Sequence, residues 1–445
     1  MSLRARAGAA LLVLLALSLG GSCAARRPVV LLPQQEPAHP VVFIPGMTGT
    51  QLRDASTGRV MWGTAHQLLF PRDGGHRMAL PVDATAPVGE VEPFAPILEL
   101  RLFGLWRKQI YGPLLQVLQS NGFRLGRLET PDPQATLFVL NYDWRRSVIE
   151  GAQRLARQLE ELRVIRGEDR LSVTLICQSN GALLARYFLK YGGASLEAAE
   201  AGRGGLPETI RVEKLVFLGP ANGGALRVFE FLHLGRSYVS LIGRRLQPET
   251  LFTFTSLYES LPVDHDGLFV DTDGQPLEAN LFDARDWERF GWSIYANGAA
   301  GRIARSRYSA RFGETEQRSA FLRTALENAA RLHRLLQADP PKFEPPRYYS
   351  IRNVYARTPI RALLVSDGTA WTTLFPGKRR VRKDPYLAAL TYAPGDGHAS
   401  VRSQNELSPL ERSAFARPPA DVDGAHFEFI LSPATERLLL EFLRE

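Results

Sequence analysis

Short apolar runs alternate with amphipathic segments along most of this chain. The apolar runs are rich in β-branched and aromatic residues, which favours buried strands. Such strands are predicted at 41–44, 137–140, 171–176, 215–218, 348–355 and 360–365. Apolar positions at helical spacing predict helices at 106–120 (interrupted at Gly112-Pro113), 147–166, 182–191, 314–337 and 434–445. Strands that alternate with helices are typical of an α/β protein, with a mostly parallel sheet and helices on both faces.

The stretch Leu171–Tyr191 combines a strand, a very short connection and a helix. It reads LSVTLI, CQSNG and ALLARYFLKY, with Ser179 in the middle of the connection. In enzymes with a G-x-S-x-G motif, such an elbow exposes the serine hydroxyl at the start of a helix. Cys177 and Gly181 are small enough for the turn. The same residues also fit an ordinary turn whose serine caps the helix.

Four residues lie just past the ends of predicted strands: Met47, Asp143, Ser179 and Ala221. The carboxyl ends of parallel strands lie at one edge of a sheet, and ligands of α/β proteins bind there. We therefore expect these residues to converge, which favours a nucleophilic serine over a capping serine.

Composition limits the classes of protein to consider. The chain has 445 residues, of which 45% are hydrophobic and 22% charged, as in a globular protein with a large core. Lys and Arg exceed Asp and Glu by 54 to 46, a net charge of +8. This excess looks spread along the chain, without the basic and aromatic stripe of nucleic-acid proteins. An anionic membrane surface is the more natural partner, and nucleic acid is not expected.

The first 39 residues resemble a targeting segment and a tether. Arg4 and Arg6 precede an apolar run at 9–19 that is too short to span a bilayer. Cleavage near Ala24 or Ala25 by ordinary signal peptidase competes with lipid modification of Cys23. We expect a signal peptide at 1–23, a Pro-rich tether at 24–39, and an exported protein: a periplasmic or outer-membrane lipoprotein, or a secreted one. Cys177 is the only other cysteine, so no internal disulfide is expected.

The remainder, 40–445, is predicted to be one domain with two insertions. An irregular excursion covers 53–105, and a cap or lid covers about 225–340. Its first part, 225–262, is apolar and basic, and fits a lid or membrane-contacting helix as well as a plain packing helix. The Asp-rich segments 264–267 and 271–274 lack the spacing of an EF-hand loop, and Asp-Gly turns are expected there instead. No metal site is expected.

An acid and a histidine follow the serine in sequence. His426 is the preferred base because it lies on a loop before the last helix, which Ser432 caps ahead of Pro433. His398 is a rival, but it lies only two residues from Asp396. Asp367 and Asp396 both follow apolar runs and precede glycine, so the pattern leaves the acid open. The order Ser, Asp, His is that of α/β-hydrolases.

Seven motifs, in order, resemble one known family. They are PVVFIPGMTGTQL (40–52), NYDWRRS (141–147), CQSNG (177–181), LGPANGGA (218–225), TSLYESLP (255–262), GDG (395–397) and His426. This set resembles the lecithin:cholesterol acyltransferase family, which includes lysosomal phospholipase A2 and phospholipid:diacylglycerol acyltransferase. The resemblance, to a bacterial member, implies an α/β-hydrolase with cap and lid. It also implies transfer of a fatty acyl group from a phospholipid to a sterol-like alcohol or to water.

The resemblance assigns roles by position. It implies Ser179 as nucleophile, Asp396 as acid, His426 as base, and the backbone N–H groups of Met47 and Asn180 as an oxyanion hole. It further suggests substrate contacts by Trp62, Tyr142, Asp143, Gln178 and Ala221, and no cofactor. The chain departs from the family where Cys177 replaces a glycine and Gln178 a histidine. It also lacks cysteines between 50 and 110, which puts membrane contact by the excursion in doubt.

Three functions therefore stay open at this point. The first is a phospholipid acyltransferase or phospholipase A-type serine hydrolase. The second is a lipase or carboxylesterase acting on neutral esters. The third is a catalytically silent lipid-binding lipoprotein whose atypical elbow does not react.

Overall fold

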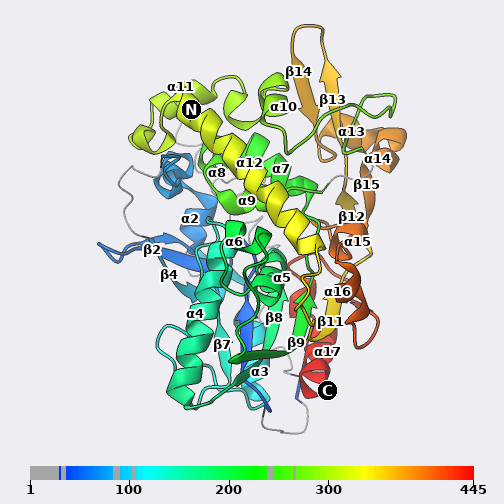
Figure 1. Ribbon diagram of the computed structural model, residues 1–445. Helices are drawn as coiled ribbons and strands as arrows, with labels where there is room; N and C mark the ends of the chain where they lie inside the picture. Colours follow the sequence, from blue (N-terminus) through cyan, green and yellow to red (C-terminus); the bar gives the residue numbers. More distant parts are fainter. Residues whose placement is uncertain (1–29, 32–36, 84–90, 103–105, 238–244, 264–266) are drawn as a thin grey trace.

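The computed structural model describes residues 30–31, 37–83, 91–102, 106–237, 245–263 and 267–445. The predicted signal peptide with Cys23, most of the tether and most of the 264–267 turn lie outside these ranges. The centre of the molecule is a six-stranded sheet in the order β16-β11-β9-β8-β1-β7 (Figure 1). Every neighbouring pair in it is parallel. Its strands are β1 (Val41–Ile44), β7 (Leu137–Val139), β8 (Leu171–Gln178), β9 (Ile210–Leu218), β11 (Arg347–Arg352) and β16 (Ala420–Asp421).

Helices cover both faces of this sheet, and alternate strand residues enter two separate cores. Val42 and Leu175 face the core that contains α4 (Val148–Arg166) and α5 (Gly181–Tyr191). Phe43 and Ile176 face the core that contains α3 (Gly112–Ser120) and α17 (Pro433–Arg444). Because successive side chains of a strand point to opposite faces, uniformly apolar strands need cover on both sides. The predicted α/β fold with helices on both faces is confirmed.

The excursion after β1 is more regular than its sequence suggests. Three antiparallel strands form a small sheet in it: β2 (Thr50–Asp54), β3 (Val60–Trp62) and β4 (Val91–Pro96). A short helix, α2 (Ala65–Leu69), and a 3₁₀ segment, η1 (Arg72–Met78), follow β3, and β5 (Glu99–Leu102) pairs with β6 (Trp106–Gln109). The predicted helix over 106–120 is thus wrong in its first part. The helix begins at Gly112 because Pro113 fits only its first turn.

Helices dominate the described residues between 226 and 337 and lie in the upper half of the view (Figure 1). They are α7 (Leu226–Leu234), α8 (Pro248–Phe252), α9 (Thr255–Glu259), α10 (Ala284–Arg289), α11 (Ala299–Ala304) and α12 (Thr315–Gln337), with 3₁₀ turns η2 (Ser293–Tyr295) and η3 (Ser309–Phe312). The ring of Phe229 on α7 is buried against Trp292, with centroids 4.7 Å apart, and against three other aromatic rings. Helix α7 is therefore a packing helix.

The remaining elements are short strands and helices, most of which lie between α12 and the last helix in sequence. They are β10 (Phe269–Val270), β12 (Ala356–Pro359), β13 (Ala362–Ser366), β14 (Trp371–Leu374), α13 (Arg379–Lys383), α14 (Pro385–Thr391) and β15 (Tyr392–Gly395), followed by α15 (Val401–Gln404), α16 (Pro409–Ser413) and η4 (Phe429–Leu431). Asp271 Oδ1 accepts the N–H groups of Asp273 (2.9 Å) and Gln275 (2.8 Å), so this segment forms the predicted turn. No group of acidic, His or Cys side chains in the described ranges is arranged to hold a metal ion.

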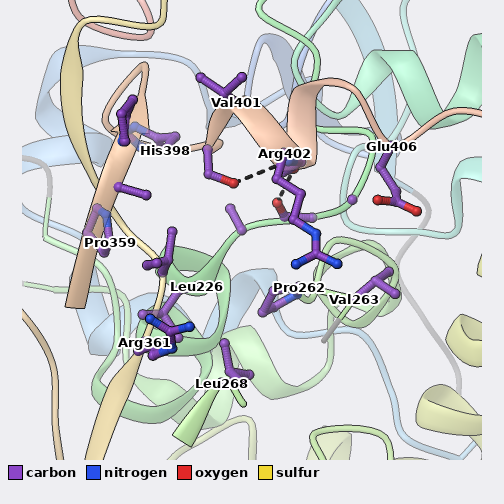
Figure 2. Close-up of a pocket in the computed structure, with 18 of the residues that line it drawn as sticks. Leu226, Pro262, Val263, Leu268, Pro359, Arg361, His398, Val401, Arg402 and Glu406 are labelled. Carbon is purple, nitrogen blue, oxygen red and sulfur yellow. Dashed lines mark hydrogen bonds between the residues drawn. The ribbon is translucent and has the colours of Figure 1, made fainter. Parts of the chain in front are cut away.

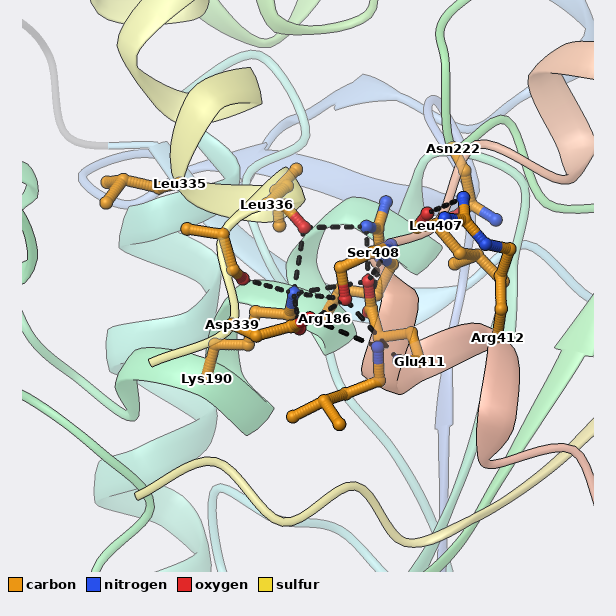
Figure 3. A network of polar contacts seen from close by, with 12 residues as sticks. Arg186, Lys190, Asn222, Leu335, Leu336, Asp339, Leu407, Ser408, Glu411 and Arg412 are labelled. Carbon is orange, nitrogen blue, oxygen red and sulfur yellow. Dashed lines mark hydrogen bonds and ion pairs between the residues drawn. The ribbon is translucent and has the colours of Figure 1, made fainter. Parts of the chain in front are cut away.

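A buried charge network ties the helix after the serine to two distant segments (Figure 3). Arg186 on α5 donates to both carboxylate oxygens of Glu411 on α16, at 2.7 and 2.6 Å. Lys190, one turn later, donates to the carbonyls of Leu336 (2.8 Å) and Ala338 (2.7 Å) at the end of α12. These bonds fix α5 along its length. None of the helices that the structure describes is long and apolar enough to cross a bilayer.

Candidate active site

Ser179 lies on a tight elbow between β8, which ends at Gln178, and α5, which begins at Gly181. Its φ is +54°, a left-handed conformation that is unusual for a residue with a side chain. A Cβ on Gly181 would lie 2.8 Å from the carbonyl oxygens of Ile44 and Pro45, so only glycine fits there. Cys177, the departure from the usual glycine, is fully buried, with its Sγ 3.7 Å from the Val216 carbonyl. The elbow geometry is therefore retained despite this substitution.

Ser179, His426 and Asp396 form one continuous hydrogen-bonded chain. Ser179 Oγ lies 2.9 Å from His426 Nε2, and His426 Nδ1 lies 2.6 Å from Asp396 Oδ2. Asp396 is fully buried, and its other oxygen accepts the N–H groups of His398 and Ala399, both at 2.8 Å. The carboxylate is thus fixed by the backbone and faces Nδ1, which leaves Nε2 to accept the serine proton.

The rival acid and base lie elsewhere. Asp367 occupies an exposed turn between β13 and β14, where its Oδ1 accepts the N–H groups of Thr369 and Ala370. These backbone bonds lower the pKa of Asp367 to about 2. His398 stacks on His426, with ring centroids 4.7 Å apart and planes 20° apart. Burial, and then the adjacent His426, hold the pKa of His398 well below its usual value, so this ring stays neutral.

The loop after β1 lies directly against the nucleophile. A Cβ on Gly46 would lie 3.0 Å from Ser179 Cβ and 2.2 Å from Gln178 Oε1. The backbone N–H groups of Met47 and Asn180 have no acceptor within the described part of the chain. Asn180 immediately precedes α5, where helices leave N–H groups unpaired. The elbow and the loop therefore bring two unpaired donors close to Ser179.

Three predicted substrate-binding side chains are placed behind this loop instead. Trp62 Nε1 donates to the Thr48 carbonyl (3.0 Å), and the Tyr142 hydroxyl donates to the Pro45 carbonyl (2.8 Å). Gln178 Oε1 accepts the Gly46 N–H at 3.1 Å. Their exposures are 1%, 2% and 0%, so their placement does not support direct substrate contact. They hold the loop that carries the Met47 N–H.

The other two predicted contacts also bond within the protein. Asp143 forms an ion pair with Arg145 at 2.7 Å, and the Ala221 N–H donates to the Ser179 carbonyl at 3.4 Å. Sequence reasoning missed Tyr111, whose buried hydroxyl donates to Gln178 Oε1 (2.9 Å) and supports the same loop. The one feature of the sequence that could have indicated Tyr111 is its position immediately before Gly112-Pro113, where α3 begins.

Two hollows lie near residues of the site, although none of Ser179, Asp396 and His426 lines either of them. A cavity of about 370 Å³ is bordered by His398, Leu226, Leu268 and Val401, with Arg361 close to Leu226 and Leu268 and with Arg402 and Glu406 on another side (Figure 2). Because the His398 ring stacks on His426, one imidazole separates this cavity from the hydrogen-bonded chain. A much smaller apolar hollow of about 10 Å³ lies next to Met47, lined also by Trp144 and Phe231.

No protein-family model matches this sequence, and no curated protein matches it. Among solved structures, a chain of the Tle4–Tli4 complex matches with a TM-score of 0.58 and 13% identity, covering 92% of this chain and 99% of that one. The RedJ thioesterase from the prodiginine biosynthetic pathway of Streptomyces coelicolor covers 95% and 98% at 16% identity, but its TM-score of 0.25 carries no argument. At 13% identity the first match bears on the fold alone. The comparison therefore supports the α/β fold and does not test the resemblance to lecithin:cholesterol acyltransferases.

Proposed function

We propose that this protein is a serine acyl hydrolase or acyltransferase that acts on a lipid ester through an acyl-enzyme on Ser179. The observation that carries the proposal is the chain Ser179–His426–Asp396, with contacts of 2.9 and 2.6 Å. Two unpaired backbone N–H groups next to the serine supply the remaining requirement, stabilisation of an oxyanion.

In the first half-reaction His426 Nε2 removes the proton of Ser179 as Oγ attacks the ester carbonyl carbon. The carbonyl electron pair moves onto oxygen, and the N–H groups of Met47 and Asn180 stabilise that charge, by about 3–4 kcal/mol each. Asp396 keeps the proton on Nδ1 and stabilises the imidazolium. The intermediate then expels the alcohol oxygen, which takes the proton from His426, and the acyl group stays on Ser179.

In the second half-reaction an incoming hydroxyl group releases the acyl group. His426 Nε2 deprotonates water or an alcohol, whose oxygen attacks the acyl-enzyme carbonyl, and the proton returns to Ser179 Oγ. Water gives a free fatty acid, and an alcohol gives a new ester. The chain uses the same residues for both outcomes, so the acceptor that reaches Ser179 decides between them.

A phospholipid is the proposed acyl donor. This choice is based on the ordered motifs that resemble lecithin:cholesterol acyltransferases and on the apolar cavity that His398 separates from His426. The N-terminal targeting pattern further suggests work outside the cytoplasm, as a periplasmic or outer-membrane lipoprotein or a secreted protein. A membrane surface is then both partner and source of substrate.

The test incubates the protein with phosphatidylcholine vesicles that carry a labelled acyl chain, with and without added sterol or long-chain alcohol. We expect label in free fatty acid or in a new ester, and none with Ser179→Ala. Release from triacylglycerol or short esters but not from phosphatidylcholine would assign a neutral-ester lipase instead. Failure of Ser179 to react with a fluorophosphonate probe would overturn the enzyme proposal and leave a lipid-binding protein.

A further inference from the structure

A concentrated basic surface lies on α13, away from the triad. Five of the six residues at 378–383 are basic: Lys378, Arg379, Arg380, Arg382 and Lys383. All five are exposed, and we call them the α13 basic patch. The sixth, Val381, is fully buried and packs with Val270, Leu363 and Leu387. One apolar anchor therefore fixes five positive charges at the surface.

The α13 basic patch has no ion-pair partner in the part of the chain that the structure describes. Some other surface arginines are paired, such as Arg285, which lies 2.5 Å from Asp283, and Arg331, which lies 2.6 Å from Glu200. Lys378 acts on Glu230 only as a longer-range attraction. The adjacent Asp384 is occupied as the cap of α14, where it accepts the Tyr386 N–H at 2.9 Å. The patch therefore offers its charge to something outside the chain.

This arrangement does not help the protein to fold. Lys378 and Arg382 are four residues apart, as are Arg379 and Lys383, and like charges at this spacing destabilise a helix. A local cost in stability without an internal partner is typical of a binding surface.

The elements around the patch also contribute to the cavity bordered by His398. Val270 and Leu363, which contact Val381, are paired neighbours on β10 and β13. The residues just before these strands, Leu268 and Arg361, border the 370 Å³ cavity (Figure 2). Figure 1 shows α13 and α14 close to β13 and β15. Val381, the anchor of the patch, therefore packs with residues of β10 and β13 that lie two positions beyond those bordering the cavity.

A lipid surface fits these features better than a nucleic acid does. No aromatic residue interleaves with the five basic residues, so the patch lacks the stacking platforms of single-strand binders. On the adjacent α14, Tyr386 is 57% exposed, and tyrosine is favoured where a membrane meets water. Clustered Lys and Arg attract anionic headgroups strongly over short distances.

We infer that the α13 basic patch docks this protein on an anionic lipid surface. Docking itself needs no catalysis. Its consequence, that the cavity bordered by His398 is held at the bilayer, rests on the proposed function. The lipid is recognised by the charge of its headgroups, so the proposal concerns anionic phospholipid in general and not one headgroup.

The test compares three full-length proteins, all carrying Ser179→Ala so that no substrate is consumed. The first has no further change. The patch variant replaces its basic residues: Lys378→Gln, Arg379→Gln, Arg380→Gln, Arg382→Gln and Lys383→Gln. The control variant removes the same charge from five exposed arginines that are likewise unpaired and scattered: Arg124→Gln, Arg157→Gln, Arg323→Gln, Arg334→Gln and Arg437→Gln. All share one N-terminus, so any anchoring through it is common to them.

The measured quantity is the ratio of affinities for vesicles of phosphatidylcholine with phosphatidylglycerol and of phosphatidylcholine alone. We expect the patch variant to lower this ratio at least ~100-fold, and the control variant less than ~5-fold. The parent ratio should also fall as salt is raised. The patch variant should melt at the same or a higher temperature than the parent, because like-charge repulsion is removed.

Equal losses in the two variants would overturn the proposal, since net charge and not the patch would then drive binding. Patch-dependent binding of a short DNA duplex without patch-dependent vesicle binding would overturn it as well. In the Ser179 background, the patch variant should retain turnover of a soluble short-chain ester. Absence of turnover in every protein would contradict the proposed function but leave the vesicle result intact.

Discussion

The backbone of Ser179 is held in a conformation that costs a residue with a Cβ about 1–3 kcal/mol. The surrounding contacts that impose φ of +54° include the Ala221 N–H on its carbonyl and the glycine at 181. Gln178, which replaces the histidine of the resembling family, is used as a support for the loop at Gly46. The departures in this elbow are therefore accommodated by contacts behind the serine.

Asp396 is the carboxylate that orients His426, and its removal tests that role. Asp396→Asn should lower kcat by roughly 10⁴-fold, because the amide favours the wrong tautomer of the imidazole. Asp367→Asn is the matched control and should leave kcat within about twofold, since Asp367 only closes its own turn. Steady-state hydrolysis of one ester by both variants gives the answer. The opposite pattern would make Asp367 the acid.

A substitution at Gly46 tests whether the neighbouring Met47 N–H group stabilises the oxyanion. Gly46→Ala should lower kcat by about 100-fold or more, because its Cβ would lie 2.2 Å from Gln178 Oε1 and displace the loop with the Met47 N–H. The control is Gly377→Ala, where a Cβ meets nothing within 4 Å, and kcat should not change. Kinetics with a soluble ester and thermal melts separate lost catalysis from unfolding. Unchanged kcat in Gly46→Ala would exclude this loop from catalysis.

At the scale of elements, α5 connects the nucleophile to the rest of the fold. Its first turn follows Ser179, and its later turns are held by Glu411 and by the end of α12. Burial raises the pKa of Glu411, but the Arg186 guanidinium outweighs it and lowers this pKa to about 2. The carboxylate is therefore charged at all ordinary pH values.

Removing that charge should destabilise the whole protein. Glu411→Gln leaves the Arg186 guanidinium buried without its counter-ion and should lower the free energy of unfolding by about 3–5 kcal/mol. Glu200→Gln breaks the exposed pair with Arg331 and should cost less than about 1 kcal/mol. Urea unfolding of the two variants measures both values. Equal small losses would mean that the buried network contributes little.

A buried carboxyl group at the start of α4, that of Glu259, makes the free energy of unfolding depend on pH. Glu259 on α9 is buried there and accepts the Ser147 hydroxyl (2.5 Å) and the Val148 N–H (2.8 Å). Burial raises its pKa to about 7 from 4.5. Because the folded-state pKa is above the unfolded one, its stabilising effect is complete below pH 4.5 and is lost as pH rises towards 7. The loss is up to about 3 kcal/mol.

Glu259→Gln should therefore remove this part of the pH dependence. Urea unfolding at pH 5 and pH 7.5 should show a smaller difference for the variant than for the parent protein, by about 3 kcal/mol at most. Glu316→Gln, an exposed carboxyl on α12, is the control and should keep the parental difference. A parental pH dependence in Glu259→Gln would show that the buried carboxyl is not the titrating group.

At the scale of the whole molecule, the central sheet lies between the two cores. Cys177 lies in that sheet, fully buried, and burial raises the pKa of its thiol. Because the elbow follows it directly, exposing this thiol requires opening β8 itself. A thiol reagent thus reports on the integrity of the sheet.

In a Cys23→Ser background, Cys177 is the single cysteine of the chain. We expect labelling by a thiol reagent to be complete in denaturant but below about 1% over the same time in native buffer, because only a rare open state reacts. Mass spectrometry of the labelled protein measures both. Rapid labelling of the native protein would show that the sheet opens locally near the nucleophile.

Some of this architecture could be predicted because its causes are local. The run at 41–44 is apolar at every position and the run at 171–176 at all but Ser172 and Thr174, and a strand buried on both faces needs such a mainly apolar pattern. Ser432 caps the last helix where expected, since a cap involves only neighbouring residues. The helix predicted over 106–109 is wrong because this segment forms β6, whose conformation is set by pairing with β5 and not by its own periodicity. The basic run at 378–383 is not evident from the net charge of the whole chain, because that charge does not record where basic residues cluster.

The amino-acid sequence by itself determined the alternation of strands and helices, and hence the α/β fold and the elbow around Ser179. Only the tertiary structure shows that Asp396, and not Asp367, contacts His426, and that Trp62, Tyr142 and Gln178 bond to the loop after β1. The physical reason is range. Strands, caps and turns depend on residues a few positions apart, whereas the bond from His426 to Ser179 joins residues 247 positions apart. No local pattern records which distant carboxylate the packed sheet and its loops bring to that imidazole.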